Sequence, residues 1–250
     1  MNTINILGLK ISNINVCETL DIINQSIKDK NKITFFTPNA DFAQNAIRQP
    51  YLKKIINSAD YLVPDGIGLF WGSKFLNTPF KERISGSSLF FLICESAQKT
   101  NYSIYLLGGN KGVAEKAAIN LRKKFPGINI VGTYFAPHGF ENNAKENEKI
   151  LMELKDKKPD ILIVGLGNFQ GERWLIKHKE EIECFLKIQL GASITFAAGD
   201  KKMPPELIKR IGLARLWIIL QEPRRRWREA FEILYFFYYL LQQKMFNKHV

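Results

Sequence analysis

Asp65 is the first candidate for a catalytic group in this sequence. It stands in Val63-Pro64-Asp65-Gly66, at the end of a short apolar run that is typical of a strand. An acid at a strand end beside glycines, which allow close approach of a substrate, can act as a general base. The alternative is a turn or helix-capping aspartate, because Asp-Gly pairs often serve that purpose.

A second candidate site is the segment TPNAD (37–41), which directly follows another predicted strand. Ligands of open α/β sheets bind where the strands end at their carboxyl edge. Thr37 and Asn39 offer hydrogen-bonding side chains at such an edge. Asn39 is equally well placed to cap a helix that begins near Asp41, and the pattern does not decide between these two roles.

Two glycine-rich turns follow predicted strands and precede predicted helices. The first contains Gly108, Gly109 and Gly112, and the second contains Gly165 and Gly167. Such turns can hold phosphate on backbone N–H groups at a helix N-terminus. Neither turn has the GxGxxG spacing or the acid about twenty residues further on that NAD enzymes use, so the pattern argues against NAD.

Arginines are candidates for a charge-neutralising role that a metal ion often fills. The sequence contains no DxD pair, no Walker motif and no HExxH motif. A transferase that releases a nucleotide diphosphate must neutralise the departing charge, and arginines can do this without metal. The candidates in the last fifth of the chain are Arg210, Arg215, Arg224, Arg225, Arg226 and Arg228.

Short apolar runs alternate with amphipathic stretches from residue 4 to residue 190, which predicts an α/β fold with a doubly wound, mostly parallel sheet. Strands are expected within residues 4–11, 32–37, 61–64, 103–109, 128–134, 160–167 and 187–191. Helices are expected at Val16–Ile27, Ser87–Gln98, Gly112–Phe125 and Ala144–Leu154. The runs around 106 and 163 are apolar on both faces, as buried parallel strands must be.

The composition changes near Gly199, where a Lys pair and two prolines predict a hinge. We therefore expect an α/β core at 1–198 and a helical appendage at 199–250, with helices at Ile211–Leu220 and from Pro223 onward. Eleven of the 36 Lys and Arg residues and four of the 24 Asp and Glu residues lie between 201 and 250, so most of the net charge of +12 is there. The apolar run FEILYFFYYLL (231–241) is shorter than the roughly 20 residues that span a bilayer. Beside the basic RRRWR (224–228), it favours binding to an anionic membrane surface, and a helix that covers the protein's own core is the alternative.

Composition restricts the class of protein further. With 250 residues, 46% hydrophobic and 24% charged, the chain is an ordinary globular protein and not a disordered one. Its three cysteines stand alone and form no zinc-binding or disulfide pattern, which favours a reducing, cytoplasmic setting. The segment MNTINILGLK lacks the basic start and long apolar core of a signal peptide.

Taken together and in order, these motifs resemble the WecG/TagA/CpsF glycosyltransferases, also called glycosyltransferase family 26. The segments that carry the resemblance are TPNAD (37–41), VPDG (63–66), RISG (83–86), IYLLGG (104–109), GLG and ERW within 165–174, IGL (211–213) and QEPRR (221–225). The resemblance implies a metal-independent, inverting enzyme without a cofactor. Its partners would be a UDP-sugar donor, of the N-acetylmannosamine type or related, and a polyprenyl-diphosphate-linked sugar acceptor. Such an enzyme works on the cytoplasmic face of the cell membrane in teichoic acid or polysaccharide synthesis.

The resemblance also implies roles for individual residues. Asp65 matches the family's base. The expected substrate-binding residues are Thr37, Asn39, Arg83, Gly108, Gly109, Gly167, Glu172, Arg215, Arg225 and Arg228. The sequence departs from the family pattern at Gly171, Thr195, Met203 and Ile218, around the expected donor sugar and diphosphate.

Two alternatives come from other classes of protein. A nucleotide-binding oxidoreductase would fit the α/β pattern but lacks the dinucleotide fingerprint. A non-enzymatic protein that binds an anionic surface or nucleic acid through the basic tail would not need Asp65, and its binding would weaken steeply with salt. For the enzyme we expect no nucleic-acid partner, and the sequence leaves a homo-oligomer open.

Overall fold

The computed structural model describes residues 2–167, 169–203, 205, 208, 217 and 223–246. The chain divides into two compact units. The first comprises residues 1–15, 37–85 and 203–250, and the second comprises 16–36 and 86–202. This division does not follow the boundary at residue 198 that the sequence predicts, because the described part of the tail packs with two N-terminal segments. An independent appendage at 199–250 therefore stays a prediction.

The sheet has six strands in the order β4-β3-β8-β7-β5-β6. Five of them belong to the second unit: β3 (Ile33–Phe36), β8 (Leu186–Gln189), β7 (Ile161–Gly165), β5 (Ile104–Gly108) and β6 (Ile130–Tyr134). Neighbouring strands among these five pair in parallel, and Gly108 of β5 lies opposite Gly165 of β7. The predicted parallel α/β fold is thereby confirmed.

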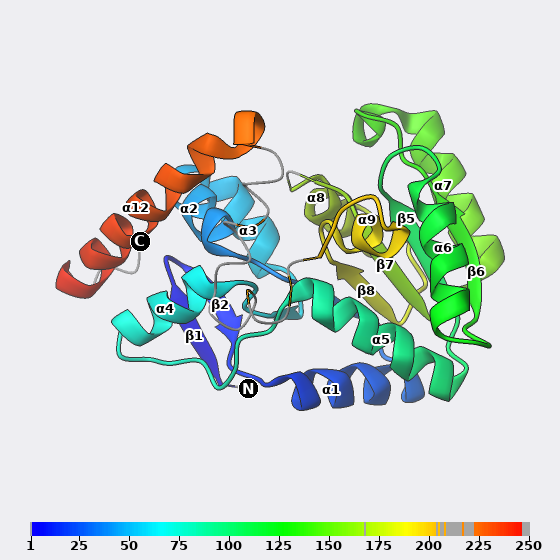
Figure 1. Ribbon diagram of the computed structural model, residues 1–250, viewed down its shortest axis with the longest axis horizontal. Helices are drawn as coiled ribbons and strands as arrows, with labels where there is room; N and C mark the ends of the chain where they lie inside the picture. The colour runs from blue at the N-terminus through cyan, green and yellow to red at the C-terminus, as the bar shows by residue number, and fades with distance from the viewer. Residues whose placement is uncertain are drawn as a thin grey trace. The chain divides into compact units, whose positions relative to one another are not determined.

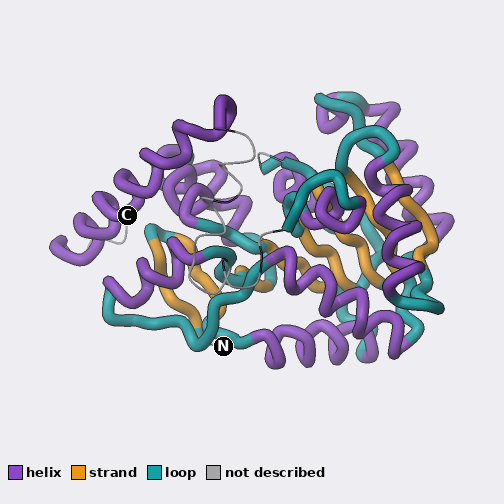
Figure 2. Tube along the Cα trace, in the orientation of Figure 1, coloured by secondary structure: helices purple, strands orange, loops and turns teal. Residues whose placement is uncertain are grey.

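Helices surround the five strands of the second unit, as Figure 2 shows. They are α1 (Val16–Lys28), α5 (Gly86–Thr100), α6 (Val113–Lys124), α7 (Ala144–Lys157), α8 (Gln170–Lys177) and α9 (Ser193–Ala198), with a short 3-10 helix η1 (Phe140–Asn142) before α7. Every residue of β5 and of β8 is buried. Burial on both faces explains the continuous apolar runs that the sequence shows there.

The first unit begins with a β-hairpin, β1 (Thr3–Ile6) and β2 (Leu9–Ser12). The sequence predicts one strand over residues 4–11, and this expectation is wrong. Leu7 and Gly8 both adopt positive φ, 53° and 85°, which is the geometry of a type I′ hairpin turn. The Gly8 N–H donates to Asn5 Oδ1 at 2.8 Å and helps to fix the turn.

The rest of the first unit is mostly helical: α2 (Ala40–Arg48), α3 (Pro50–Asn57), α4 (Ile67–Phe75) and α12 (Pro223–Phe246), with the short strand β4 (Tyr61–Leu62). Helix α12 begins at Pro223 as predicted, and it lies beside α2 in Figure 1. The predicted helix at 211–220 lies outside the described residues.

One face of α12 is anchored in the first unit. Phe236 and Leu240 are fully buried, and a Cβ at Gly72 of α4 would lie 3.0 Å from atoms of both. Gln243 exchanges hydrogen bonds with the hairpin: its amide donates to Asn5 O at 3.0 Å, and its Oε1 accepts from the Leu7 N–H at 2.8 Å. The expectation that part of the apolar run covers the protein's own core is therefore confirmed for these residues.

Candidate active site

Asp65 lies between two other segments of the first unit. Its backbone N–H donates to Pro38 O at 2.9 Å, and the residue forms an isolated parallel bridge with Ile84. Asp65 is half-buried. These main-chain contacts bring the segments around residues 38, 65 and 84 together, although they are distant in the sequence.

Gly66 leaves open space beside Asp65. It is the N-cap residue of α4, with φ 82° and ψ 163°, a conformation that is essentially restricted to glycine. Apart from its two chain neighbours, no atom of the described residues lies within 4 Å of the position that a Cβ would take, and Gly66 has no side chain with which to cap the helix. The helix N-terminus, with its partial positive charge, is thus one residue away from the Asp65 backbone. Since Gly66 is the cap, Asp65 is not the capping residue that the sequence left as an alternative.

Asn39 is the N-cap residue of α2. Its Oδ1 accepts hydrogen bonds from the N–H groups of Asp41 at 2.9 Å and Phe42 at 3.2 Å. The capping interpretation is confirmed, and contact of Asn39 with a substrate stays a prediction. The N-terminal turns of α2 and α4 are close, because a Cβ on Gly68 would lie 2.9 Å from Ala40 Cβ.

Thr37 and Arg83 flank the same cluster along the chain. Thr37 is half-buried and directly precedes Pro38, whose carbonyl oxygen binds the Asp65 backbone. Arg83 is half-buried and directly precedes Ile84, the bridge partner of Asp65. The structure therefore brings Thr37, Asn39, Asp65 and Arg83 into one part of the first unit, as a common site requires.

The predicted glycine turns lie in the second unit, at the carboxyl ends of β5 and β7. Gly108 has φ 127°, and a Cβ there would lie 2.6 Å from Gly165 O. The Gly109 N–H donates to this same oxygen at 3.2 Å. Gly167 is exposed, and apart from its chain neighbours no atom of the described residues lies within 4 Å of its Cβ position. Close packing of the two strand ends thus requires Gly108, whereas Gly167 leaves room at the sheet edge.

Glu172 lies in the first turn of α8 and is buried, with 1% of its surface exposed. Among the described residues, its Oε2 has no hydrogen-bond partner. Burial raises the pKa of its carboxyl group to about 8, against smaller opposite effects of its own backbone N–H and of Arg173. The carboxyl group is therefore mostly neutral at pH 7, which the sequence did not predict.

The tail arginines are only partly described. Arg215 lies outside the described residues. Arg225 and Arg228 belong to the first turns of α12, and their side chains lie outside the described part of the structure. No group of three or more His, Cys, Asp and Glu side chains that could hold a metal ion occurs in the described ranges.

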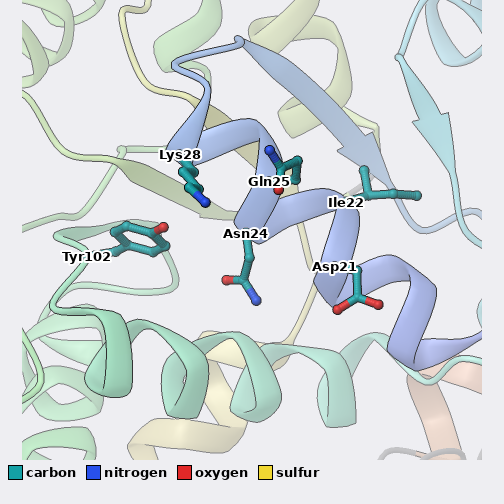
Figure 3. Close-up of a pocket in the computed structure, with 6 residues that line it drawn as sticks. All are labelled: Asp21, Ile22, Asn24, Gln25, Lys28 and Tyr102. Atoms are coloured by element: carbon teal, nitrogen blue, oxygen red, sulfur yellow. The ribbon is translucent and has the colours of Figure 1, made fainter.

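A hollow elsewhere in the second unit is not placed for this chemistry. It measures about 530 Å³ and lies between α1 and Tyr102, which precedes β5 (Figure 3). Its lining residues are Asp21, Ile22, Asn24, Gln25, Lys28 and Tyr102. Asn24 and Gln25 already bond to Ser96 and Asp29. The hollow is at the amino end of β5, whereas ligands of such sheets bind at the carboxyl ends of strands.

The comparison with known proteins decides the family. The profile of the glycosyl transferase WecG/TagA/CpsF family matches residues 4–250. The chain belongs to this family of glycosyltransferases. Family membership favours the transferase over the oxidoreductase and over a non-enzymatic binding protein.

Two curated relatives illustrate the similarity. One, from Staphylococcus aureus strain MW2, is 26% identical over 224 residues, which cover 89% of this chain and 86% of the relative. The other, from Bacillus spizizenii strain W23, is 27% identical over 206 residues, which cover 82% and 77%. Both are named N-acetylglucosaminyldiphosphoundecaprenol N-acetyl-β-D-mannosaminyltransferase.

The sequence reasoning overlooked Gln189 at the end of β8. Its side-chain amide donates to Leu166 O, and a Cβ on Gly171 would lie 2.5 Å from the Gln189 side chain. The signal in the sequence was a glutamine within the otherwise apolar run IQL (188–190), two residues before Gly191.

Proposed function

We propose that this WecG/TagA/CpsF glycosyltransferase transfers an N-acetylmannosamine-type sugar from a UDP-sugar to a sugar linked to polyprenyl diphosphate. The names of the two relatives support this acceptor and this sugar. The observation that carries the proposal is the placement of Asp65. It lies next to the open space at Gly66 and within the cluster that contains Thr37, Asn39 and Arg83.

Asp65 is the proposed general base. It takes the proton from the acceptor hydroxyl group as that oxygen forms a bond to the anomeric carbon of the donor. The bond from that carbon to the diphosphate oxygen breaks on the opposite side, so the configuration inverts. The departing UDP gains negative charge, which protein groups must stabilise.

Arginines of α12 are the proposed source of that positive charge. Helices α12 and α4 run in the same direction, because Gly72 meets Phe236 and Leu240 while Phe75 O accepts a bond from Lys244 at 2.6 Å. Arg225 and Arg228, in the first turns of α12, are the proposed source of this charge, and Arg215 is the third proposed arginine.

Each unit offers further proposed substrate contacts of its own. Thr37, Asn39 and Arg83 are proposed to bind substrate around Asp65. Gly108, Gly109 and Gly167 are proposed to bind the donor nucleotide at the carboxyl ends of β5 and β7, because glycine turns expose backbone N–H groups to phosphate. The proposed reaction needs no metal ion, because arginines would stabilise the leaving diphosphate.

Association with the inner surface of the cell membrane is the proposed location. Within the described residues, no helix has both the length and the apolar character needed to cross a bilayer. Helix α12 instead presents Leu234, Tyr238, Leu241 and Met245 to the outside, with 45–67% of each side chain exposed. Their spacing of three and four residues forms one stripe along the helix. An apolar stripe that follows a basic first turn fits an anionic membrane surface.

Sugar transfer from UDP-N-acetylmannosamine to a polyprenyl-diphosphate N-acetylglucosamine lipid tests the proposal directly. Asp65→Asn is expected to lower kcat by about 10²–10⁴-fold and to leave donor binding intact. Asp60→Asn, at an exposed aspartate of the same unit, is the matched control and is expected to keep wild-type turnover. Wild-type turnover of Asp65→Asn would refute the role of the base, and a wild-type protein that transfers no sugar to this lipid would refute the function.

A further inference from the structure

Helix α4 places small residues inward and aromatic residues outward. Its buried residues are Leu69, Gly72 and Ser73, whereas Trp71 is 49% exposed and Phe70 is half-buried. A surface helix of a globular protein normally has the reverse pattern, with large apolar side chains in the core and polar ones in water. An aromatic outer side on this helix therefore indicates a partner for that side.

Packing and hydrogen bonding explain the small residues at the inner positions. A Cβ on Gly72 would lie 3.0 Å from side-chain atoms of α12, which occupies the space beside this glycine. The Ser73 hydroxyl group donates to Phe70 O at 2.8 Å and accepts from the Phe80 N–H at 3.2 Å. These contacts keep large side chains out of the inner positions, but they do not require aromatic residues on the outer side.

The outer side of α4 continues onto α12. The rings of Phe75 and Phe237 meet edge to face, with their centroids 6.4 Å apart. Trp71 lies one helical turn before Phe75, and Leu241 lies one turn after Phe237, so each pair shares a side of its helix. Leu241 is 45% exposed and belongs to the exposed stripe of α12. Trp71, Phe75, Phe237 and Leu241 thus form one apolar surface across two helices, here called the α4–α12 face.

Within the described side chains, the two helices bring only positive charge to this face. Lys74 Nζ lies 4.6 Å from the centroid of the Phe70 ring, and Lys244 Nζ lies 4.5 Å from that of the Phe75 ring. Neither α4 nor residues 234–245 of α12 contain an aspartate or a glutamate. Aromatic rings with lysines beside them match the boundary of an anionic bilayer, where rings lie at headgroup depth and ammonium groups reach phosphate.

A second copy of this chain is a poorer occupant of the α4–α12 face. In a symmetric dimer the same patch meets itself across a two-fold axis. Lys74 and Lys244 would then meet the lysines of the other copy, and the described side chains of the two helices offer no carboxylate to compensate. Like charges that face each other across an interface oppose association. Anionic lipid supplies the charge that the face lacks.

We propose that α4 is a second membrane-contact helix, which binds an anionic lipid surface together with α12 and places Trp71 at the level of the headgroups. The inference rests on the membrane location in the proposed function and extends it to a helix that the sequence analysis did not assign to the membrane. Phe236 and Leu240 already pack α12 against Gly72 of α4. The face is therefore complete before it meets lipid, unlike a segment that folds on binding.

Flotation of the full chain with phosphatidylglycerol vesicles tests the proposal, and phosphatidylcholine vesicles are the neutral comparison. Trp71→Ala is expected to weaken binding to the anionic vesicles by about tenfold, because the exposed half of a large aromatic side chain no longer leaves water. Ile119→Ala, at a 53% exposed isoleucine of α6, is the matched control and is expected to bind as the wild type does. Wild-type binding by Trp71→Ala would overturn the proposal.

The two lysines provide an independent test. Lys74→Gln and Lys244→Gln are each expected to weaken binding to phosphatidylglycerol vesicles by about fivefold. Lys145→Gln, at an exposed lysine of α7, is the control for loss of one positive charge and is expected to have little effect. Equal binding of the wild type to charged and neutral vesicles would overturn the proposal, because the face would then not select anionic lipid.

A spectroscopic measurement keeps the test decisive if Trp71→Ala folds poorly. Trp71→Phe retains an aromatic ring and removes one fluorophore. Brominated phosphatidylglycerol is expected to quench the wild type more strongly than Trp71→Phe, and equal quenching would overturn the contact of Trp71 with lipid. Backbone amides of residues 234–245 are expected to exchange slowly without lipid. Rapid exchange that vesicles suppress would overturn the claim that the face is complete beforehand.

The remaining outcomes separate this inference from a dimer and from the proposed reaction. A wild-type dimer that Trp71→Ala abolishes, without vesicle binding, would assign the face to a second copy and overturn the proposal. Sugar transfer to a lipid acceptor in detergent reports the reaction separately. Absence of transfer there would refute the proposed function and leave the vesicle results standing, whereas transfer without vesicle binding would overturn this inference alone.

Discussion

Replacement of Leu240 by alanine is expected to destabilise the first unit strongly. Leu240 is completely buried, and its Cδ1 lies 3.0 Å from the position of a Cβ at Gly72, so the substitution leaves a cavity between α12 and α4. Leucine-to-alanine changes in cores cost about 2–5 kcal/mol. We expect this loss in the free energy of unfolding, measured by urea denaturation with far-UV circular dichroism.

Leu234→Ala is the matched control, because Leu234 lies on the same helix with 67% of its side chain exposed. Surface changes of this kind usually alter stability by less than about 0.5 kcal/mol. For binding to anionic vesicles we expect the opposite ranking of the two variants: Leu234→Ala weakens flotation more than Leu240→Ala does. Equal losses of stability in the two variants would refute the packing of α12, and undiminished flotation of Leu234→Ala would refute the exposed membrane face.

Three further predictions concern the site. Asn39→Ala should cost about 1 kcal/mol of stability through the lost cap, whereas Asn39→Asp should retain the cap; an Asn39→Asp variant with full stability but low transfer activity would show that the amide also binds substrate. Gly108→Ala should destabilise the fold by about 1–3 kcal/mol from backbone strain alone, with the clash against Gly165 O in addition; a thermal melt that matches the wild type would contradict this. Transfer activity should survive EDTA, and a loss that Mg²⁺ or Mn²⁺ restores would contradict the assignment of charge stabilisation to arginines.

The sequence predicted most strands and helices of the second unit because their patterns are local. The buried run around Leu106 and the repeat at Val113, Ala117 and Leu121 each reflect the surroundings of a single element. The hairpin at residues 3–12 was missed because its turn, Leu7-Gly8, lies within a continuous apolar run. Its signal was one glycine after a leucine, whereas Asn-Gly and Asp-Gly are the stronger signs of such turns.

The sequence placed candidate residues at the ends of elements, but it did not show which segments of the chain come together. Motifs placed Asp65 and Asn39 at the ends of elements, and the structure agrees. Which segments form one unit depends on contacts between distant parts of the chain, such as Gly72 with Leu240, and local periodicity carries no such information. The burial of Glu172 was hidden for the same reason, because a glutamate in the polar-looking segment QGERW is enclosed only by its neighbours in space.

The interleaving of the two units has a consequence for the order of events during protein synthesis. The second unit ends at Lys202, so all of its strands and helices are synthesised before the last segment of the first unit. Asp65 is made early, but the buried side chains of α12 that cover Gly72 follow some 170 residues later. Until then, the apolar surface of α4 around Gly72 lacks its cover and is a site where chaperones can bind or nascent chains can associate. The newly made protein thus completes its first unit last, when α12 is made.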